Sequence, residues 1–492
     1  MTNTNVLVIG AGNAALTAAL AASEQGARVT VLERAPYEER GGNTAFTGGA
    51  LRMVYHGLED IEQLVPDIPE EQKAETDFGS YTEADFLGDL ARVTEHRIDP
   101  ELAEVLVSNS FDTYRWLRSK GMRFALMYGR QAFKVDGRFQ FFGGLAVESW
   151  GGGPEWSKAL FDAVDREGIE VRYEARAVEL LTEGRAVRGV RILQSGEKQA
   201  LDADAVVVAT GGFQANAEWR SRNLGPGWDL ARVRGSRFDT GDGLRMALDI
   251  GASPAGHWSG CHAVGWDMNA PEFGDLRVGD GFQKHCYPYG IMVNADGVRF
   301  VDEGADFRNY TYAKYGRVVL EQPQQFAWQI FDSKTEHLMR DEYRHSDVTK
   351  VTADSLPELA KRLEGVDAER FLRTVEEYNA AVPDEPSFNP NVLDGRQTEG
   401  LDVPKSNWSQ RIDEPPFSAY GIGCGITFTF GGLRVTTDAQ VVDTDGRPIP
   451  GLYAAGDLVG GIFYFNYPAG SGLTSGVVFG RLAGSHAVTA AA

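Results

Sequence analysis

The stretch that decides the fold is Asn5-Val-Leu-Val-Ile-Gly10-Ala-Gly12-Asn-Ala-Ala15-Leu, near the start of the chain. The apolar run 5–9 predicts a strand, and the Ala- and Leu-rich segment 13–25 predicts a helix. A second strand is predicted over 28–33. Strand, glycine-rich turn, helix and strand in succession form a βαβ unit with parallel strands. Gly10-x-Gly12-x-x-Ala15 is therefore predicted to be a dinucleotide-binding turn, in which Gly12 lets a pyrophosphate approach the backbone.

Further motifs indicate that this dinucleotide is FAD. Glu33 ends the second strand, where a carboxylate accepts hydrogen bonds from ribose hydroxyls. Two glycine pairs, at 41–42 and 48–49, follow the acid, and a flavin ring extending past the pyrophosphate must lie against bare backbone there. Two distant segments fit the same cofactor, Ala-Thr-Gly-Gly at 209–212 and Gly-Leu-Tyr-Ala-Ala-Gly-Asp at 451–457. The predicted FAD-binding residues are Gly10, Gly12, Asn13, Ala14, Glu33, Arg34, Gly42, Asn43, Thr44, Gly48, Gly49, Ala177, Thr210, Gly211, Gly212, Gly456, Asp457, Ser471, Gly472, Leu473 and Thr474.

The pattern of elements along the chain predicts an α/β protein with a Rossmann-like FAD-binding domain and an inserted α+β capping (substrate) domain. Residues 1–260 and 420–492 are expected to build the FAD-binding domain, and residues 261–419 the capping domain. Helices are predicted within 81–121 and over 156–166, 356–363, 368–382 and 472–492. Strands are predicted over 171–173, 175–181, 186–193, 205–210, 433–442 and 452–455. Most of 260–419 is predicted to be polar loops with short helices.

Charge and cysteine content exclude several classes of protein. The chain has 492 residues with 48 Lys or Arg and 70 Asp or Glu, a formal charge of −22. Nucleic acid is therefore not an expected partner, because a phosphate backbone needs a basic face. The three cysteines form no Cys-x-x-Cys pair, which argues against a disulfide framework, a metal site, an iron–sulfur cluster or a c-type haem. We find no signal peptide or transmembrane run, so the sequence predicts a cytoplasmic protein.

The motifs together resemble the fumarate reductase and succinate dehydrogenase flavoprotein family. They are GAGNAAL at 10–16, RGGNT at 40–44, ATGG at 209–212, GDG at 241–243 and LYAAGD at 452–457. Within that family, the segments 299–315 and 425–432 resemble tricarballylate dehydrogenase. The resemblance implies non-covalent FAD, because the histidine that bonds FAD in the respiratory enzymes is missing from 44–51. It also implies removal of two hydrogens from adjacent carbons beside a carboxylate, with hydride passing to flavin N5, as in the conversion of tricarballylate to cis-aconitate.

The same resemblance implies the catalytic residues. Arg308 matches the family's proton-shuttling arginine and Glu303 its relay, although one extra residue separates them here. His262 matches a histidine that binds a substrate carboxylate, and Arg299 is a further cation expected to attract an anionic substrate. Thr427 and Tyr467 are departures, because they stand where the family has a histidine and a carboxylate-binding arginine. A plain C4 dicarboxylate is therefore less expected.

Alternatives remain open at this point. Tyr467 and the Pro and Gly that follow it resemble 3-ketosteroid dehydrogenases, in which a tyrosine and a backbone N–H polarise a ketone. In such a desaturase of a cyclic ketone or oxo-acid, Tyr310 or Tyr312 is a candidate base. The remaining alternatives are a fumarate-reductase-type ene-reductase and a non-enzymatic flavin-binding or sensor protein. The sequence has no second Gly-x-Gly-x-x-Gly for NADPH. A separate electron acceptor is therefore expected, either a quinone or the membrane electron-transfer partner that the resemblance implies.

Overall fold

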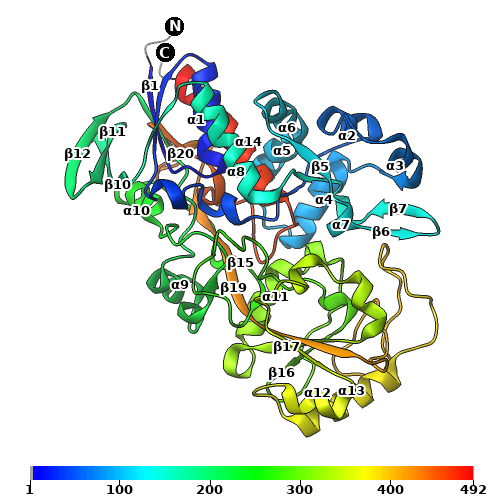
Figure 1. Cartoon of the computed structure of the whole chain (residues 1–492). Coiled ribbons are helices and arrows are strands. Elements are labelled where there is room, and N and C mark those ends of the chain that lie inside the picture. The colour runs from blue at the N-terminus through cyan, green and yellow to red at the C-terminus, as the bar shows by residue number, and fades with distance from the viewer. Residues whose placement is uncertain (1–3, 491–492) are drawn as a thin grey trace.

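The computed structural model describes residues 4–490. Strands from the first and last parts of the chain belong to one six-stranded sheet, in the upper left of Figure 1. The strand order is β20-β21-β13-β1-β2-β9, with all pairs parallel except β20 with β21. The strands are β1 (Asn5–Ile9), β2 (Arg28–Leu32), β9 (Glu170–Arg172), β13 (Ala205–Val208), β20 (Gln440–Val442) and β21 (Pro448–Ala454). Segments from both ends of the chain thus build one mainly parallel sheet, which confirms the predicted α/β class.

The predicted helix after the glycine turn packs against the predicted last helix. They are α1 (Asn13–Glu24) and α14 (Ser471–Thr489), which lie side by side in Figure 1. Gly480 and Gly484 allow this packing, because a Cβ on either would overlap the backbone of Ala14 or Ala18 in α1. The helix was predicted to reach residue 492, but residues 491–492 lie outside the described part of the chain.

A helical region lies between β2 and β9 in the sequence, beside the central sheet (Figure 1). Its helices are α2 (Leu58–Leu64), α3 (Glu70–Glu75), α4 (Glu83–Val93), α5 (Pro100–Ser108), α6 (Ser110–Ser119), α7 (Tyr128–Gln131) and α8 (Gly152–Arg166). Its short strands are β3 (Ala50–Leu51), β4 (Thr76–Asp77), β5 (Phe124–Leu126), β6 (Ala132–Val135), β7 (Arg138–Phe141) and β8 (Val147–Ser149). The three helices α4 to α6 agree with the helical spacing predicted over 81–121.

A second sheet, of order β14-β19-β17-β16 with β15 and β18 also paired to β19, forms the core of the lower half of Figure 1. Its strands are β14 (Arg232–Val233), β15 (Pro254–Asp267), β16 (Ile291–Asn294), β17 (Ala327–Phe331), β18 (Lys350–Ala353) and β19 (Phe417–Leu433). Helices α11 (Tyr312–Leu320), α12 (Leu356–Arg362) and α13 (Ala368–Ala381) accompany it. The predicted boundaries at 260/261 and 419/420 fall inside β15 and β19, so these two strands are continuous across them. The domain boundaries stay a prediction.

Two sequence predictions about strands were wrong. Residues 260–419 are largely loops and short helices, as expected, but the strands β15 to β18 that cross them and the long strand β19 after them were missed. β19 is glycine-rich and shows no polar alternation. Both faces of its central part are buried, and a Cβ on Gly425 would lie 2.6 Å from Cβ of Trp266, so small residues are required there. The segment 433–442 is not one strand. Ala439 has φ +62° and its N–H donates to the carbonyl of Thr436, which turns the chain before β20 begins.

The remaining strands form a small sheet that packs beside β13 and β21; they are β10 (Arg176–Glu183), β11 (Ala186–Gln194) and β12 (Glu197–Asp202). Helix α10 (Asp242–Asp249) packs against this sheet, and α9 (Ala217–Leu224) packs against β15. Among residues 4–490, no helix has the length and apolar character needed to cross a bilayer.

Candidate active site

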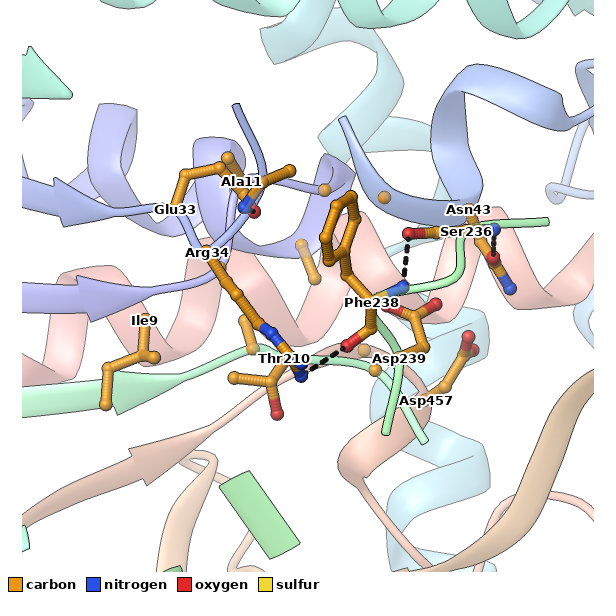
Figure 2. Close-up of a pocket in the computed structure, with 18 of the residues that line it drawn as sticks. Ile9, Ala11, Glu33, Arg34, Asn43, Thr210, Ser236, Phe238, Asp239 and Asp457 are labelled. Carbon is orange, nitrogen blue, oxygen red and sulfur yellow. Dashed lines mark hydrogen bonds between the residues drawn. The ribbon is translucent and has the colours of Figure 1, made fainter. Parts of the chain in front are cut away.

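A cavity of about 910 Å³ opens where β1 and β2 end and α1 begins (Figure 2). Gly10 has φ +104°, a conformation that favours glycine, and Gly12 is the residue that precedes α1. The first turn of α1 contains no acidic residue, so its positive end faces the cavity uncompensated. Fifteen predicted FAD-binding residues line it: Gly10, Gly12, Asn13, Ala14, Glu33, Arg34, Gly42, Asn43, Thr44, Ala177, Thr210, Gly211, Gly456, Asp457 and Gly472.

One wall of this cavity carries a network of hydrogen bonds and ion pairs around Asp242. Arg34 donates to Thr240 Oγ1 at 2.5 Å and lies 3.1 Å from Asp242 Oδ2. Figure 2 shows its further bond to the carbonyl of Phe238. Arg176 also pairs with Asp242, through both carboxylate oxygens. The GDG segment therefore acts here through Asp242, which fixes two arginines at the cavity wall.

Besides Asp242, three acidic side chains line the cavity: Glu33, Asp239 and Asp457 (Figure 2). Burial raises the pKa of Glu33, and burial together with the charge of Asp457 raises that of Asp239 well above its usual value. Burial alone raises the pKa of Asp457 to about 7. Ribose and ribitol hydroxyls donate hydrogen bonds to such carboxylates, so the acids suit a polyhydroxy cofactor. Asp239 was missed by the sequence analysis, and its only signal was its position three residues before the GDG aspartate.

These shifts predict that the apoprotein loses stability as the pH rises. A carboxyl whose pKa is raised by folding binds its proton more tightly in the folded state, so raising the pH from about 4 to about 7 favours unfolding. We expect this effect to lower the melting temperature of the apoprotein between about pH 4 and about pH 7, and to do so less in Asp457→Asn. Thermal unfolding followed by circular dichroism in matched buffers measures both slopes. Equal slopes would contradict the assignment to Asp457.

The residues present fit FAD. Thr210 Oγ1 is buried without a hydrogen-bond partner among the described residues and belongs to the cavity lining, so a ligand hydroxyl or phosphate can satisfy it. A Cβ on Gly12 would meet nothing closer than Thr44 Oγ1 at 3.5 Å, which shows open space above that backbone. Unpaired donors, a helix N-terminus and hydroxyl-binding acids together match the pyrophosphate and sugars of a dinucleotide.

A second cavity, of about 930 Å³, continues from the first. Both are lined by Asn13, Asn43, Thr44, Asp457 and Gly472, so a cofactor lying in the first can extend into the second. Gly48, Gly49 and Leu473 line the second cavity, as predicted for residues against the flavin ring. The part of this cavity beyond Gly472 is therefore the candidate substrate space.

One end of the second cavity is formed by His262, Tyr312 and Tyr467. Neither ring nitrogen of His262 has a hydrogen-bond partner in the described chain, although the side chain is buried. Burial, with a smaller effect from Arg234, lowers the pKa of His262 well below its usual value, so the ring is neutral. The hydroxyls of Tyr312 and Tyr467 lie 2.6 Å apart, and burial raises the pKa of both. This end offers neutral donors and acceptors.

Thr427 stands where the family has a histidine, but an arginine just after another strand lies beside it. Arg234, the residue after β14, donates to Thr427 Oγ1 at 3.2 Å and binds Asp280 at 2.6 Å. The sequence analysis missed Arg234, because it is almost 200 residues from Thr427 and only the pairing of β14 with β19 brings them together.

The other end of the second cavity is rich in arginine. Arg308 donates to Gln131 Oε1 at 2.6 Å, and Arg130, Arg340 and His285 lie in the same lining. Burial, followed by the charge of Arg340, lowers the pKa of Arg308 to about 10. Of these residues only Arg308 was predicted from the sequence. Arg340 and His285 come from loops, and Arg130 and Gln131 from the short helix α7, all without a motif.

Several predicted residues are not part of either cavity lining. Arg299 and Glu303 pair with each other at 2.6 Å, and Glu303 also accepts from the N–H of Met292. Among the described hydrogen bonds of Arg308 and Glu303, none joins the two, so the relay between them stays a prediction. The others outside the linings are Gly212, Ser471, Thr474 and Tyr310. Tyr310 donates instead to Asp89, so of the two candidate bases only Tyr312 lines the cavity.

Comparison with known proteins identifies the family. The family described as "FAD binding domain" matches residues 5–473. A probable fumarate reductase of Shewanella frigidimarina is 30% identical over 501 residues, covering 98% of this chain and 74% of that protein. A 4-oxocyclohexanecarboxylate 2-dehydrogenase of Sinomonas cyclohexanicum is 29% identical over 544 residues, covering 98% of this chain and 92% of the relative.

The solved structure of a flavocytochrome c3 fumarate reductase in its open conformation superposes with a TM-score of 0.73 at 28% identity, covering 100% of this chain and 79% of the other. The narrower resemblance to tricarballylate dehydrogenase is not shown by these relatives. The continuous cofactor and substrate cavities agree with the matches, and the chain belongs to the FAD-binding fumarate reductase flavoproteins, as an FAD-dependent oxidoreductase.

Proposed function

We propose that this protein interconverts a carbon–carbon single bond and a double bond beside a carbonyl or carboxylate group of a small anionic substrate. The observation that carries this proposal is the second cavity, where Arg308, Arg340, His262 and Tyr467 surround a space continuous with the cofactor cavity. FAD, when bound, supplies the acceptor or donor of a hydride. The chain must then hold the substrate's anionic group and move one proton at the neighbouring carbon.

Arg308 is the proposed proton carrier. A free guanidinium keeps its proton at any ordinary pH. The pKa of about 10 at this position makes loss of the proton from Arg308 easier than from a free guanidinium. Gln131 fixes the side chain from one side, and Gln131 Nε2 itself donates to the carbonyl of Phe142 at 2.9 Å. Arg308 is thus held in one orientation at the cavity wall, which a proton carrier requires.

A second candidate activity is desaturation of an oxo-acid, with the ketone activated by tyrosine. The 2.6 Å contact between the Tyr312 and Tyr467 hydroxyls favours it, because one phenol can donate to a ketone oxygen while the other fixes its orientation. The relative named 4-oxocyclohexanecarboxylate 2-dehydrogenase also supports it. Tricarballylate, implied by the sequence resemblance, stays a prediction to be tested in the same way.

The electron partner is also a proposal. We expect electrons to be exchanged with a separate carrier, a quinone or an electron-transfer protein, because the cysteines form no haem-attachment pair. Cytoplasmic location, with association to a membrane through such a partner, remains a prediction from the sequence.

An anaerobic titration of the FAD-loaded enzyme tests the function. Tricarballylate, succinate and 4-oxocyclohexanecarboxylate are added separately, and bleaching of the oxidised flavin band is recorded. The converse experiment adds fumarate to dithionite-reduced enzyme and records reoxidation. We expect one compound to change the flavin redox state at least about 100-fold faster than the others, because a pocket built for specific polar groups strongly rejects analogues that lack them. If no carboxylate or oxo-acid changes it in either direction, the proposal fails.

A further inference from the structure

Arg340 has no hydrogen-bond partner although it is buried in the lining of the second cavity. Its side chain is 6% exposed, and Nε, Nη1 and Nη2 are all without a partner among the described residues. A guanidinium carries five N–H donors in a planar arrangement, and buried donors in native proteins are almost always paired. The position therefore calls for an acceptor that comes from outside the chain.

Glu342, the ion-pair partner of Arg340, balances its charge without occupying its donors. Glu342 Oε1 lies 2.7 Å from Arg340 Nη2, yet neither atom has the geometry of a hydrogen bond. Burial raises the pKa of Glu342, but the charges of Arg340 and Arg130 outweigh this effect and hold it below its usual value. Glu342 is therefore ionised, while the planar face of donors on Arg340 remains free for a ligand carboxylate.

The ion pairs around the cavity favour a ligand with one negative charge. Four arginines line it: Arg130, Arg234, Arg308 and Arg340. Three carboxylates pair with them: Asp280 contacts Arg234 and Arg130, Glu148 lies 3.9 Å from Arg130, and Glu342 contacts Arg340. A fourth carboxyl group, Asp457, also lines the cofactor cavity; burial raises its pKa to about 7, and no described ion pair joins it to the four arginines. The three ion-paired carboxylates thus leave one arginine over, because Arg308, bound only to the neutral Gln131 in the described contacts, has no carboxylate partner.

The histidines do not change this count. Burial and the four surrounding arginines lower the pKa of His285 well below its usual value, and His262 is likewise neutral. His285 Nε2 is also without a partner and lies in the same lining as Arg340. It can add a hydrogen bond to a ligand but no charge. A buried excess of one positive charge favours a monoanion, because a dianion would bring one uncompensated negative charge into the site.

We propose that Arg340 binds the single carboxylate of a monocarboxylate substrate, and that Asp280, Glu148 and Glu342 exclude dicarboxylates by leaving the cavity only one excess positive charge. This inference rests on the proposed function, since it specifies the substrate of the same site. It assigns the carboxylate to Arg340 and leaves proton transfer to Arg308. The neutral end, with Tyr312, Tyr467 and His262, is then available for an uncharged polar group of the same molecule.

Binding to the oxidised FAD-loaded enzyme tests this proposal without any redox step, so it can fail separately from the proposed function. Cyclohexanecarboxylate, cyclohexanecarboxamide and fumarate are titrated, with flavin difference spectra and calorimetry as readouts. We expect the carboxylate to bind at least about 10-fold more tightly than either the amide or fumarate. No detectable binding of the carboxylate, equal binding of the amide, or tighter binding of fumarate would each overturn the proposal.

Variants locate the effect at Arg340. Arg340→Gln should weaken binding of the carboxylate by about 10- to 100-fold and leave the amide unchanged, while Arg340→Lys should recover part of the loss because it restores charge without the fork of donors. Arg344→Gln, an exposed arginine four residues on, is the matched control and should change nothing. If Arg340→Gln does not fold, Glu342→Gln decides, because it adds one net positive charge. It should shift preference toward fumarate, and an unchanged preference would contradict the charge count.

Discussion

Replacing Arg308 with glutamine is expected to lower the rate of flavin reduction by substrate by about 10²- to 10⁴-fold, the contribution of a positioned acid or base. The side chain lines the substrate cavity, is fixed by Gln131, and has a pKa lowered to about 10. Glutamine keeps a polar but shorter side chain, and its neutral amide neither gives up nor takes up a proton at ordinary pH. The loss should therefore appear in kcat more than in KM.

Anaerobic stopped-flow reduction of the FAD-loaded variant measures this rate directly. The visible spectrum first confirms that FAD is bound in a normal ratio, because Arg308 is absent from the lining of the cofactor cavity. Arg317→Gln is a suitable control, since this residue is half-exposed on α11 and pairs with Glu321. If Arg308→Gln kept nearly full activity, the proton carrier would have to be sought at Tyr312 instead. A matching loss in Tyr312→Phe would then support the oxo-acid reaction.

The cofactor half of the site could be predicted from the sequence because its signals are local. Gly10, Gly12 and Glu33 belong to one βαβ unit whose strands, turn and helix follow each other directly, and the structure places all three in one cavity. Such a unit needs little information from the rest of the chain. The ends of β13 and β21 could be placed beside it because each carries a short motif at the carboxyl end of a strand.

The substrate half could be predicted only in part. Arg308 was found through a resemblance, but Arg340 lies in a loop with no motif, and nothing in its neighbours shows that it reaches the cavity. Arg234 shows the same limit: its contact with Thr427 depends on the pairing of β14 with β19, which join distant parts of the chain. Long glycine-rich strands such as β19 were themselves missed. Their glycines are explained by contacts with Trp266 and Trp258, which local sequence does not reveal.

Replacing Gly12 with valine is expected to weaken FAD binding by at least about 100-fold, a change of about 2.7 kcal/mol, while leaving the fold intact. The backbone of Gly12 has φ −76° and ψ −179°, a conformation open to any residue. A Cβ there would make only ordinary contacts, 3.5 Å from Thr44 Oγ1 and 3.8 Å from the carbonyl of Gly41. The added atoms would project into the cofactor cavity, where they would hold the pyrophosphate away from the N-terminus of α1.

Three glycine variants separate cofactor binding from folding. Gly10→Ala should lose both, because Gly10 has φ +104° and its Cβ would overlap the carbonyl of Ala209. Gly88→Ala lies inside α4 with open space around it, so it should keep FAD and gain about 0.5–1 kcal/mol of stability from the better helix former. Gly12→Val should show a folded circular dichroism spectrum with little bound flavin, measured as the flavin-to-protein absorbance ratio and by calorimetric titration of the apoprotein. If Gly12→Val instead bound FAD like Gly88→Ala, the pyrophosphate could not lie over Gly12, and the FAD assignment of the first cavity would have to be redrawn around Gly42, where a Cβ would meet nothing closer than 3.8 Å.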